Sequence, residues 1–295
     1  MKRATAFAPA HISGIFAVHD EAEDPLKKGS RGAGWSLELG ATAVVQKAPG
    51  TTVAIRLAGD KAPFAAPVTQ AALRHLAPDA GLQVELKLDL PVGQGFGMSA
   101  AGTLAACLAA TSVLDLDPEL ALQAAHRAEV ESGTGLGDAI GSWFGAGELR
   151  IKPGCPPAGW AMRIEIPEET EFVFCVVGDP IPTPNVIRDP AWKARTRELG
   201  DAAVDRILAV GRGNAWDALV DESARFGQAL GLMPATMKHA AATLPTGTKW
   251  GQAMLGRTMW LATDGGSAAR AEAALQGKGQ VLRCQADVLG ARLLR

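Results

Sequence analysis

The stretch Pro91-Val-Gly-Gln-Gly-Phe-Gly-Met-Ser-Ala-Ala-Gly102 decides the fold of this chain of 295 residues. It follows a predicted strand, Leu82–Leu88, in which apolar residues alternate, and it leads into a charge-free, alanine-rich run that predicts a buried helix. Its alternating glycines lack the Cβ atoms that would block a ligand, and a helix that begins near Ser99 offers unpaired N–H groups. The combination predicts a phosphate-binding loop.

The familiar nucleotide-binding motifs do not fit this loop. The residue before Ser99 is Met98, whereas the Walker sequence requires a lysine there. The glycines at 93, 95 and 97 also lack the spacing of a dinucleotide-binding motif. Ser99 is placed to contact a phosphate oxygen or magnesium, or alternatively to cap its own helix. We expect phosphate binding, and a tight structural turn is the alternative.

Composition excludes several classes of protein. Lys and Arg total 29 against 31 Asp and Glu, and aromatic residues make up 5% with no Tyr, so we expect no nucleic-acid binding. The four cysteines form no CxxC pair, which predicts reduced thiols rather than a zinc site. The charge-free run 90–114 is too rich in Gly and Ala for a membrane span. Pro9 and His11 interrupt the N-terminal region early, so we expect a cytoplasmic protein without a signal peptide or membrane contact.

Strands and helices are mixed irregularly in both halves, which predicts an α+β fold. Residues 5–60 are expected to be mostly strands and loops, with β-rich runs at 41–45 and 51–57 and a polar loop at 20–34. A strand at 82–88 and helices at 67–76, 99–115, 119–130 and 139–144 are expected in the rest of the first half. The segment KPGCPPAG at 152–159 has the composition of a connection, so the predicted domains are residues 1–150 and 160–295. The second half is expected to contain strands at 171–177, 258–262 and 280–283, a proline-rich loop at 180–190, and helices at 199–210, 215–230, 234–244 and from Ser267.

The glycine loop resembles the second sequence motif of the GHMP kinases, and Ala8-Pro-Ala-His11 resembles the first. Relatives often carry Lys or Arg where His11 stands. The stretch Gly251-Gln-Ala-Met-Leu-Gly256 resembles a degraded form of the family's third motif, which is normally a glycine run. Within the superfamily, APAHISGIF, DPLKKGSRGAG, GQGFGMSAAGTL, AEVESGTGLGD and AMLG look most like archaeal-type pantoate kinases. The resemblance covers most of the chain, is strong in the first 140 residues and is thin between 150 and 245.

This resemblance implies a two-domain kinase that binds ATP at the domain junction. The residues expected to bind ATP are Pro91, Gly93, Gly95, Phe96, Gly97, Met98, Ser99 and Ala100. The family usually has a serine where Met98 stands, so one hydroxyl is missing. The expected acceptor is a small hydroxy acid, pantoate, with mevalonate or homoserine as alternatives. A ligand sensor without catalytic activity is the alternative from another class, and a homodimer is left open.

Carboxylates lie before and after a second glycine-rich turn at 132–138. A kinase needs hard oxygen ligands for Mg²⁺ and a carboxylate that accepts or orients the substrate's hydroxyl proton. By resemblance, Asp138 is the catalytic aspartate, and Glu129 with Ser99 binds Mg²⁺. Glu129 precedes Asp138 by nine residues, fewer than in several relatives, which leaves Glu131 as a rival. The structural alternatives are a solvated Glu129 and an Asp138 that caps the next helix.

Pantoate carries a carboxylate, so its site should offer a guanidinium or ammonium group. Arg31, in the glycine-rich stretch 29–34, is the leading candidate because its planar fork can hold both carboxylate oxygens. The motif position of His11 and Ser13 places them in the same site, although His11 can also be a structural hydrogen-bonding residue. Thr183 is a further candidate for substrate contact.

Overall fold

Two long strands, β1 (Arg3–His19) and β2 (Gly29–Ala48), pair antiparallel and form the centre of the first sheet. The structure is a computed structural model that describes residues 2–180 and 189–295, so Thr183 lies outside the described residues. Nearly all of β1 is buried because layers cover it on both sides. Its register against β2 shifts between Pro9 and Ala10 and again between Ser13 and Ile15, and such bulges bend a strand and redirect its side chains.

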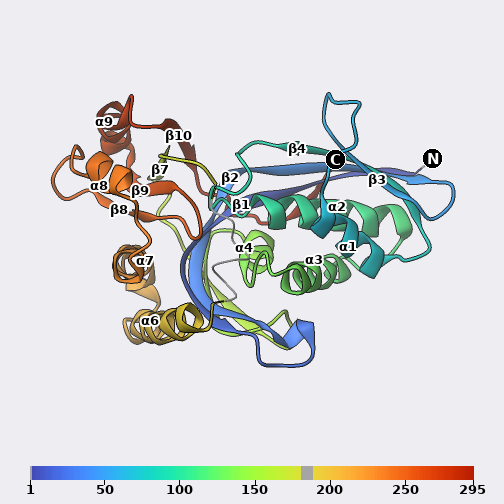
Figure 1. The fold of residues 1–295 in the computed structure, drawn as a ribbon, viewed down its shortest axis with the longest axis horizontal. Coiled ribbons are helices and arrows are strands. Elements are labelled where there is room, and N and C mark those ends of the chain that lie inside the picture. The colour runs from blue at the N-terminus through green and yellow to red at the C-terminus, as the bar shows by residue number, and fades with distance from the viewer. Residues whose placement is uncertain (1, 181–188) are drawn as a thin grey trace.

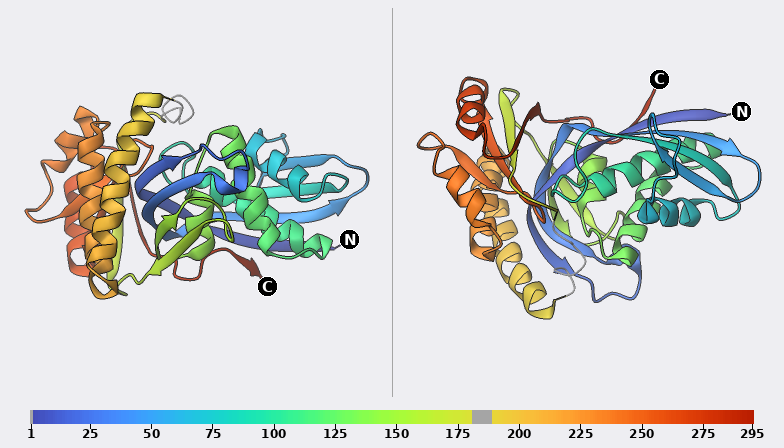
Figure 2. Two further views of the ribbon diagram at one scale, coloured as in Figure 1. Left: turned by 90° about the horizontal axis from the view of Figure 1, so that it is seen from below. Right: turned by 45° about the horizontal axis from the view of Figure 1, so that its top comes forward.

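The other strands of the first sheet extend this pair on both sides. β4 (Gly81–Leu88) pairs with the second half of β2, and β3 (Val53–Leu57) pairs in parallel with β4 after the crossover helix α1 (Pro67–Leu76). β5 (Gly147–Lys152) pairs with the first half of β2, and β6 (Trp160–Ile164) pairs with β5. The edge strand β11 (Arg292–Leu294) pairs with β1, so both ends of the described chain lie at this sheet (Figure 2).

Helices α1, α2 (Met98–Leu114), α3 (Glu119–Ser132) and α4 (Asp138–Phe144) gather on one side of the first sheet (Figure 1). α2 packs against β1, β2, α1 and α3, and almost every residue of it is buried. The small side chains of its alanines allow this close approach from several directions. The absence of charge in this segment therefore reflects a helix covered nearly all round, as the sequence predicts.

A second sheet has the strand order β10-β7-β9-β8, formed by β7 (Thr170–Val176), β8 (Lys249–Gln252), β9 (Thr258–Asp264) and β10 (Gln280–Gln285). The helices of this half are α6 (Pro190–Ala209), α7 (Ala215–Leu230), α8 (Ala235–Ala241) and α9 (Gly265–Leu275). Two short 3₁₀ helices, η1 (Pro25–Lys27) and η2 (Arg212–Asn214), complete the described elements. No helix among the described residues is both long and apolar enough to cross a membrane.

Aromatic side chains join the two halves. Trp35 of β2 stacks on Phe172 of β7 with ring centroids 5.5 Å apart, and it meets Trp260 of β9 edge-on at 5.0 Å. All three side chains are fully buried. α6 and α7 both pack against β1, and the two helices lie on one side of this strand (Figure 1). The junction is therefore a continuous hydrophobic core, which fixes the position of one half against the other.

The structure confirms the α+β class and corrects several elements. Residues 29–34, expected within a loop, begin β2, because glycines permit the close packing that this central strand requires. α6 begins at Pro190 rather than near 199, with Asp189 as its N-cap. The strands β5, β6, β8 and β11 were not expected. β6 lies beyond the predicted connection yet pairs with β5, while the division into domains 1–150 and 160–295 stays a prediction.

Candidate active site

The glycine loop joins β4 to α2 and ends at Gly97, the N-cap of α2. Gly97 has φ of +61° and Gly95 has φ of +87°, which are left-handed conformations that favour glycine. A Cβ on Gly95 would lie 2.7 Å from the carbonyl oxygen of Ala253, so a side chain does not fit there. The loop therefore brings bare backbone to the start of α2, where N–H groups and the helix dipole favour an anion.

Neighbours from the second sheet hold this loop in place. Phe96 is buried and meets Phe174 of β7 edge-on, with ring centroids 5.3 Å apart. The Gln94 side chain donates a 2.8 Å hydrogen bond to the carbonyl of Gly178, and Thr258 Oγ1 donates one of 2.6 Å to the carbonyl of Gln94. The loop is therefore fixed before any ligand arrives, which reduces the entropy lost on binding.

The shortened third motif forms a turn between β8 and β9 that lies on the glycine loop. A Cβ on Gly256 would be 2.0 Å from the carbonyl oxygen of Gln94, so the two turns are in direct backbone contact. The N–H of Met254 donates a 3.2 Å hydrogen bond to the carbonyl of Ser13. This turn thus connects the second half of the chain to both of the other motifs.

A cavity of about 340 Å³ opens at the start of α2. Six of the eight residues expected to bind ATP line it, namely Gly93, Gly95, Gly97, Met98, Ser99 and Ala100. Pro91 and Phe96 are not among its lining residues, and Phe96 instead supports the loop from the core. Glu129 and Asp138 line the same cavity, as do Met254 and Leu255 from the second half of the chain.

Apolar and polar groups both line the cavity. The apolar side chains come from the segment before α1, from the first residue of α1, from β4 and from the loop after β4, and they are Phe64, Pro67, Leu86, Leu88 and Val92. The polar groups are the bare loop, Ser99 and the two carboxylates. A cavity that combines apolar side chains with an anion-binding loop fits a molecule with a flat heterocycle and phosphate groups.

Asp138 is the first residue of α4 and keeps 21% of its side chain exposed. Its Oδ1 accepts hydrogen bonds from His11 Nδ1 and from Ser13 Oγ, each 2.9 Å long. Burial raises the pKa of this carboxyl, but the bonds and positive charge of its partners outweigh burial and leave the pKa below its usual value. Asp138 is therefore a carboxylate, and no described residue donates a hydrogen bond to its Oδ2.

His11 and Ser13 owe their direction to the two bulges in β1. They lie between the register shifts, two residues apart, and both reach Asp138. The structure thus brings both predicted substrate-binding residues to the candidate site, where their contact is with the carboxylate. Contact of His11 and Ser13 with a substrate stays a prediction.

Glu129 of α3 is 2% exposed and borders the cavity near Asp138. No described residue donates a hydrogen bond to its carboxyl group, which lies against the backbone at Gly135. Burial, with the negative charge of Asp138 second, raises its pKa well above the usual value. An uncompensated carboxylate facing a cavity suits a cation, because a cation restores the charge balance that burial removes.

Glu131, the rival for the metal, lies outside this cavity. Its carboxylate is 37% exposed and pairs with His75 at 2.7 Å and with Arg127 at 2.8 Å. Among the described residues, no group of three or more acidic, His or Cys side chains could hold a metal ion.

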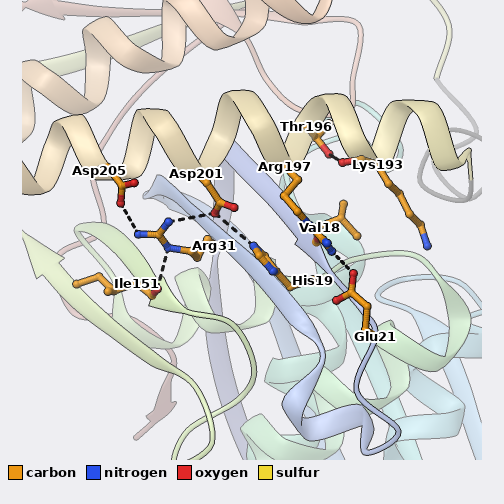
Figure 3. A network of polar contacts seen from close by, with 10 residues as sticks. All are labelled: Val18, His19, Glu21, Arg31, Ile151, Lys193, Thr196, Arg197, Asp201 and Asp205. Carbon is orange, nitrogen blue, oxygen red and sulfur yellow. Dashed lines mark hydrogen bonds and ion pairs between the residues drawn. The ribbon is translucent and has the colours of Figure 1, made fainter.

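Arg31 is not among the residues that line the cavity. Its Nη1 and Nη2 pair with Asp201 and Asp205 of α6 at 3.1 and 2.7 Å, and its Nε donates to the carbonyl of Ile151 at 3.0 Å (Figure 3). The neighbouring His19 also reaches Asp201, at 3.3 Å. In this arrangement every nitrogen of the Arg31 guanidinium has a protein partner that ties α6 to β2.

Two buried charged residues beside Asp138 were missed by sequence reasoning. Glu148 and Arg150 of β5 are 0% and 1% exposed, pair with each other, and Glu148 also accepts a 2.9 Å hydrogen bond from His11 Nε2. Arg150 Nε is buried without a partner among the described residues. The signal was present in Gly147-Glu-Leu-Arg150, where opposite charges two residues apart share a face of a strand.

Comparison with known proteins places this geometry among kinases. The model of the GHMP kinases N terminal domain matches residues 65–146. A pantoate kinase of Thermococcus kodakarensis is 32% identical over 255 residues, which cover 81% of this chain and 80% of the relative. A pantoate kinase of Methanospirillum hungatei is 33% identical over 196 residues, covering 63% of this chain and 64% of the relative.

Solved structures agree with the sequence relatives. A phosphotransferase related to the CoA biosynthesis pathway superimposes with a TM-score of 0.85 and 26% identity, covering 100% of this chain and 99% of that one. A homoserine kinase from Cytophaga hutchinsonii has a TM-score of 0.71 at 17% identity, covering 100% of this chain and 98% of that one. The second likeness shows the shared fold.

Proposed function

This chain belongs to the pantoate kinases of the GHMP kinase superfamily, and from that premise we propose that it transfers the γ-phosphate of ATP to the primary hydroxyl group of pantoate, forming 4-phosphopantoate on the route to coenzyme A. One observation carries the chemistry. The glycine loop at the start of α2 and the exposed edge of Asp138 open into the same cavity. A phosphate donor and a hydroxyl acceptor can therefore meet there in line.

Different groups in the cavity bind the phosphates, the acceptor hydroxyl and the base of ATP. Backbone N–H groups of the glycine loop and the Ser99 hydroxyl hold the phosphates at the N-terminus of α2. Asp138 accepts hydrogen bonds from His11 and Ser13 on Oδ1, which leaves Oδ2 to accept a hydrogen bond from the substrate's hydroxyl group. Asp138 then orients the attacking oxygen towards the γ-phosphorus or takes up its proton, while the new P–O bond forms, the bond from the γ-phosphorus to the β-phosphate oxygen breaks and ADP leaves. The apolar side chains of Phe64 and Leu88 accommodate the base.

We propose that Ser99 and Glu129 hold Mg²⁺ at this site. The unpartnered, buried carboxylate of Glu129 supports this assignment, because it lines the cavity with Ser99. Glu129 would offer an anionic oxygen and Ser99 a neutral one, since both line the cavity. Mg²⁺ held there would offset the negative charge that develops on the transferred phosphate.

A substrate panel tests the acceptor. Release of ADP is measured with ATP and Mg²⁺ and with pantoate, mevalonate or homoserine in parallel, and the phosphorylated carbon is identified by ³¹P and ¹³C NMR. We expect pantoate to be turned over with the highest kcat/KM and to carry phosphate on its primary hydroxyl. Equal or better turnover of mevalonate would remove the pantoate assignment. A protein that binds ATP but turns over none of the three would instead be a sensor.

Two arginines compete for the pantoate carboxylate. Arg31 remains a prediction, but the bonds to α6 already occupy its nitrogens. Arg150 is the second candidate, because its Nε is buried and unpartnered among the described residues, next to Gly137 and the Ser30 hydroxyl. A buried guanidinium donor without an acceptor is costly unless a ligand supplies one.

Conservative variants separate these two arginines. We expect R150K to raise the KM for pantoate by about 10- to 100-fold, the loss expected for a charge-assisted hydrogen bond, while the KM for ATP stays near that of the wild type. R31K should leave the KM for pantoate nearly unchanged. The reverse pattern would return the role to Arg31.

A further inference from the structure

The imidazole of His11 lies between two carboxylates. Its Nδ1 is 2.9 Å from Asp138 Oδ1, and its Nε2 is 2.9 Å from Glu148 Oε2. Ionised carboxylates can only accept hydrogen bonds, so both contacts are made together only when both ring nitrogens carry a hydrogen. With both carboxylates ionised, the geometry therefore calls for an imidazolium, a buried positive charge between two acids.

The ring has no freedom to turn away from either carboxylate. His11 is fully buried, and its own N–H donates a 3.0 Å hydrogen bond to the carbonyl of Phe96 in the glycine loop. A Cβ on Gly141 would lie 2.3 Å from His11 Nε2, and one on Gly34 would lie 2.5 Å from the same atom. Two glycines on separate elements thus leave a slot that the ring fills in one orientation.

Glu148 contacts the His11 ring at Nε2, the nitrogen that does not reach Asp138. It comes from β5 and is fully buried, so it touches neither the cavity nor solvent. Its Oε2 holds His11, while its Oε1 is paired with Nη1 of Arg150 on the same strand. Asp138, His11, Glu148 and Arg150 therefore form a chain of contacts in which negative and positive charges alternate.

The charged groups around His11 differ in sign and distance. Asp138 from α4 and Glu148 from β5 contact it directly. At longer range, the charge of His11 acts on Glu129 of α3, and the charge of Arg150 of β5 acts on Asp138. Burial lowers the pKa of His11, but the charge of Glu148 and the bonds to both carboxylates outweigh it and raise the pKa to about 9. Loss of the Glu148 charge would leave a buried ring with a single anionic neighbour in contact.

We propose that Glu148 is a positioning residue for phosphoryl transfer, which acts through His11 by keeping its ring charged and aimed at Oδ1 of Asp138. The fixed charge keeps Asp138 ionised and leaves its Oδ2 directed to the acceptor. This inference rests on the proposed kinase function and adds to it a residue that contacts no substrate. It accounts for a buried acid on β5 that does not line the cavity.

The pH dependence of kcat/KM for pantoate separates positioning from simple structural support. In the wild type we expect activity to persist until the pH approaches about 9. In E148Q the His11 ring loses its proton more easily. The alkaline limb of the pH profile, where kcat/KM falls as the pH rises, should therefore move to a lower pH by at least about one unit, and activity should recover as the pH is lowered towards 6. An equal loss at every pH, with the limb unmoved, would overturn the proposal.

A matched control removes the same kind of group elsewhere. Glu222 of α7 is 4% exposed and pairs with Arg206 and Arg225, away from the cavity. E222Q therefore also removes a buried, paired carboxylate, and we expect it to lower stability without moving the alkaline limb. A limb that moves in E222Q as it does in E148Q would show a general effect of instability and overturn the assignment.

Rescue and a direct measurement of charge complete the test. In H11K/E148Q the ammonium group stays charged without Glu148, so the alkaline limb of the pH profile should return towards its wild-type position. An alkaline limb at a pH as low as in E148Q would contradict the proposal.

¹⁵N NMR of histidine-labelled wild-type protein, with H11K to assign the signal, should show both His11 nitrogens protonated at pH 7.5. A neutral ring would overturn the proposal even if E148Q does not fold. Absence of pantoate turnover by the wild type would refute the proposed function alone, because the NMR result does not depend on it.

Discussion

At the scale of single residues, the candidate site is a set of charges whose balance depends on burial. Asp138 is stabilised as a carboxylate by two donors on one oxygen, whereas Glu129 nearby has no donor from the described residues. The two acids therefore respond to the same cavity in opposite ways, one with a lowered pKa and one with a raised pKa. That separation suits a division of labour between proton handling and cation binding.

Replacement of Asp138 by asparagine tests the proposed base or anchor. D138N keeps the shape of the side chain and an oxygen for His11, but it removes the negative charge. We expect kcat to fall by about 10²- to 10⁴-fold, the usual contribution of a positioned acid or base. ATP affinity, measured by calorimetry without acceptor, should stay close to that of the wild type. Unchanged turnover in D138N would contradict the mechanism.

The charge on His11 also predicts how stability depends on pH. The folded pKa of about 9 lies above the usual value of 6.5, so the folded state binds this proton more tightly than the unfolded state does. The stabilisation is complete below about pH 6.5 and is lost as the pH rises through about 9, with a total of about 3 kcal/mol. Urea unfolding between pH 6 and 9.5 should show this decline in the wild type. H11K should flatten it, and an equally steep decline in H11K would assign the effect to another group.

The sequence could predict residues whose role depends on a local pattern. The sequence could place Ser99 and the glycines before it at a turn that begins a helix, because both are local events, and the structure places these residues on the cavity. Their binding of ATP stays a prediction. Glu148 and Arg150 could not be recognised, because their meaning comes from His11, 137 positions from Glu148 in the sequence. Arg31 met the chemical requirement for a carboxylate partner, but sequence alone could not reveal the acids of α6 opposite it.

At the scale of elements, the site depends on contact between two turns. The glycine loop precedes α2 and the third motif joins β8 to β9, and their backbones meet at Gln94 and Gly256. Neither turn contributes a charged side chain to this contact. Its precision comes from the absence of side chains, which lets one backbone lie directly on the other.

A single methyl group should disturb that contact. In G256A the new Cβ would lie 2.0 Å from the carbonyl oxygen of Gln94, so the glycine loop must shift. We expect a loss of about 1–3 kcal/mol in the free energy of unfolding and a higher KM for ATP, with a smaller change in the KM for pantoate. G213A is the control, because a Cβ there meets no atom within 4 Å. Wild-type ATP kinetics in G256A would show that the loop does not need this contact.

Elements were predicted well where the pattern was strong and poorly where partners decided the outcome. α2 was found because a charge-free run rich in Ala and Gly predicts a helix that is covered nearly all round by the rest of the fold. The start of β2 was missed because glycine-rich segments usually form loops, and here the neighbouring strands impose an extended form. The short β8 and β11 have too few residues to show a period of their own.

At the scale of the whole molecule, the two halves share one core and one cavity. Trp35 lies against Phe172 and Trp260, and the cavity is lined by both the glycine loop and Met254. The first sheet also needs β6 and β11, which follow the predicted domain boundary in sequence. The two halves are therefore held together by a shared core and shared strands, not only by the connecting segment.

A fragment containing residues 1–150 should therefore fail to fold by itself. It would expose the aromatic face around Trp35 and leave the edges of β1 and β5 without partners. We expect poor dispersion in its ¹H–¹⁵N NMR spectrum and no cooperative urea transition, whereas the full chain should show both. A fragment with a sharp transition would establish residues 1–150 as an independent domain.

The two bulges of β1 constrain how this strand can change over time. Each shift in register resets which side chains face the helices, and His11 and Ser13 occupy the short interval between the shifts. Exchange of one apolar residue for another in this region does not change which side chains of β1 point to each face of the sheet. An insertion or deletion of one residue rotates the histidine to the opposite face of the sheet. This part of the protein can therefore vary in composition far more readily than in length.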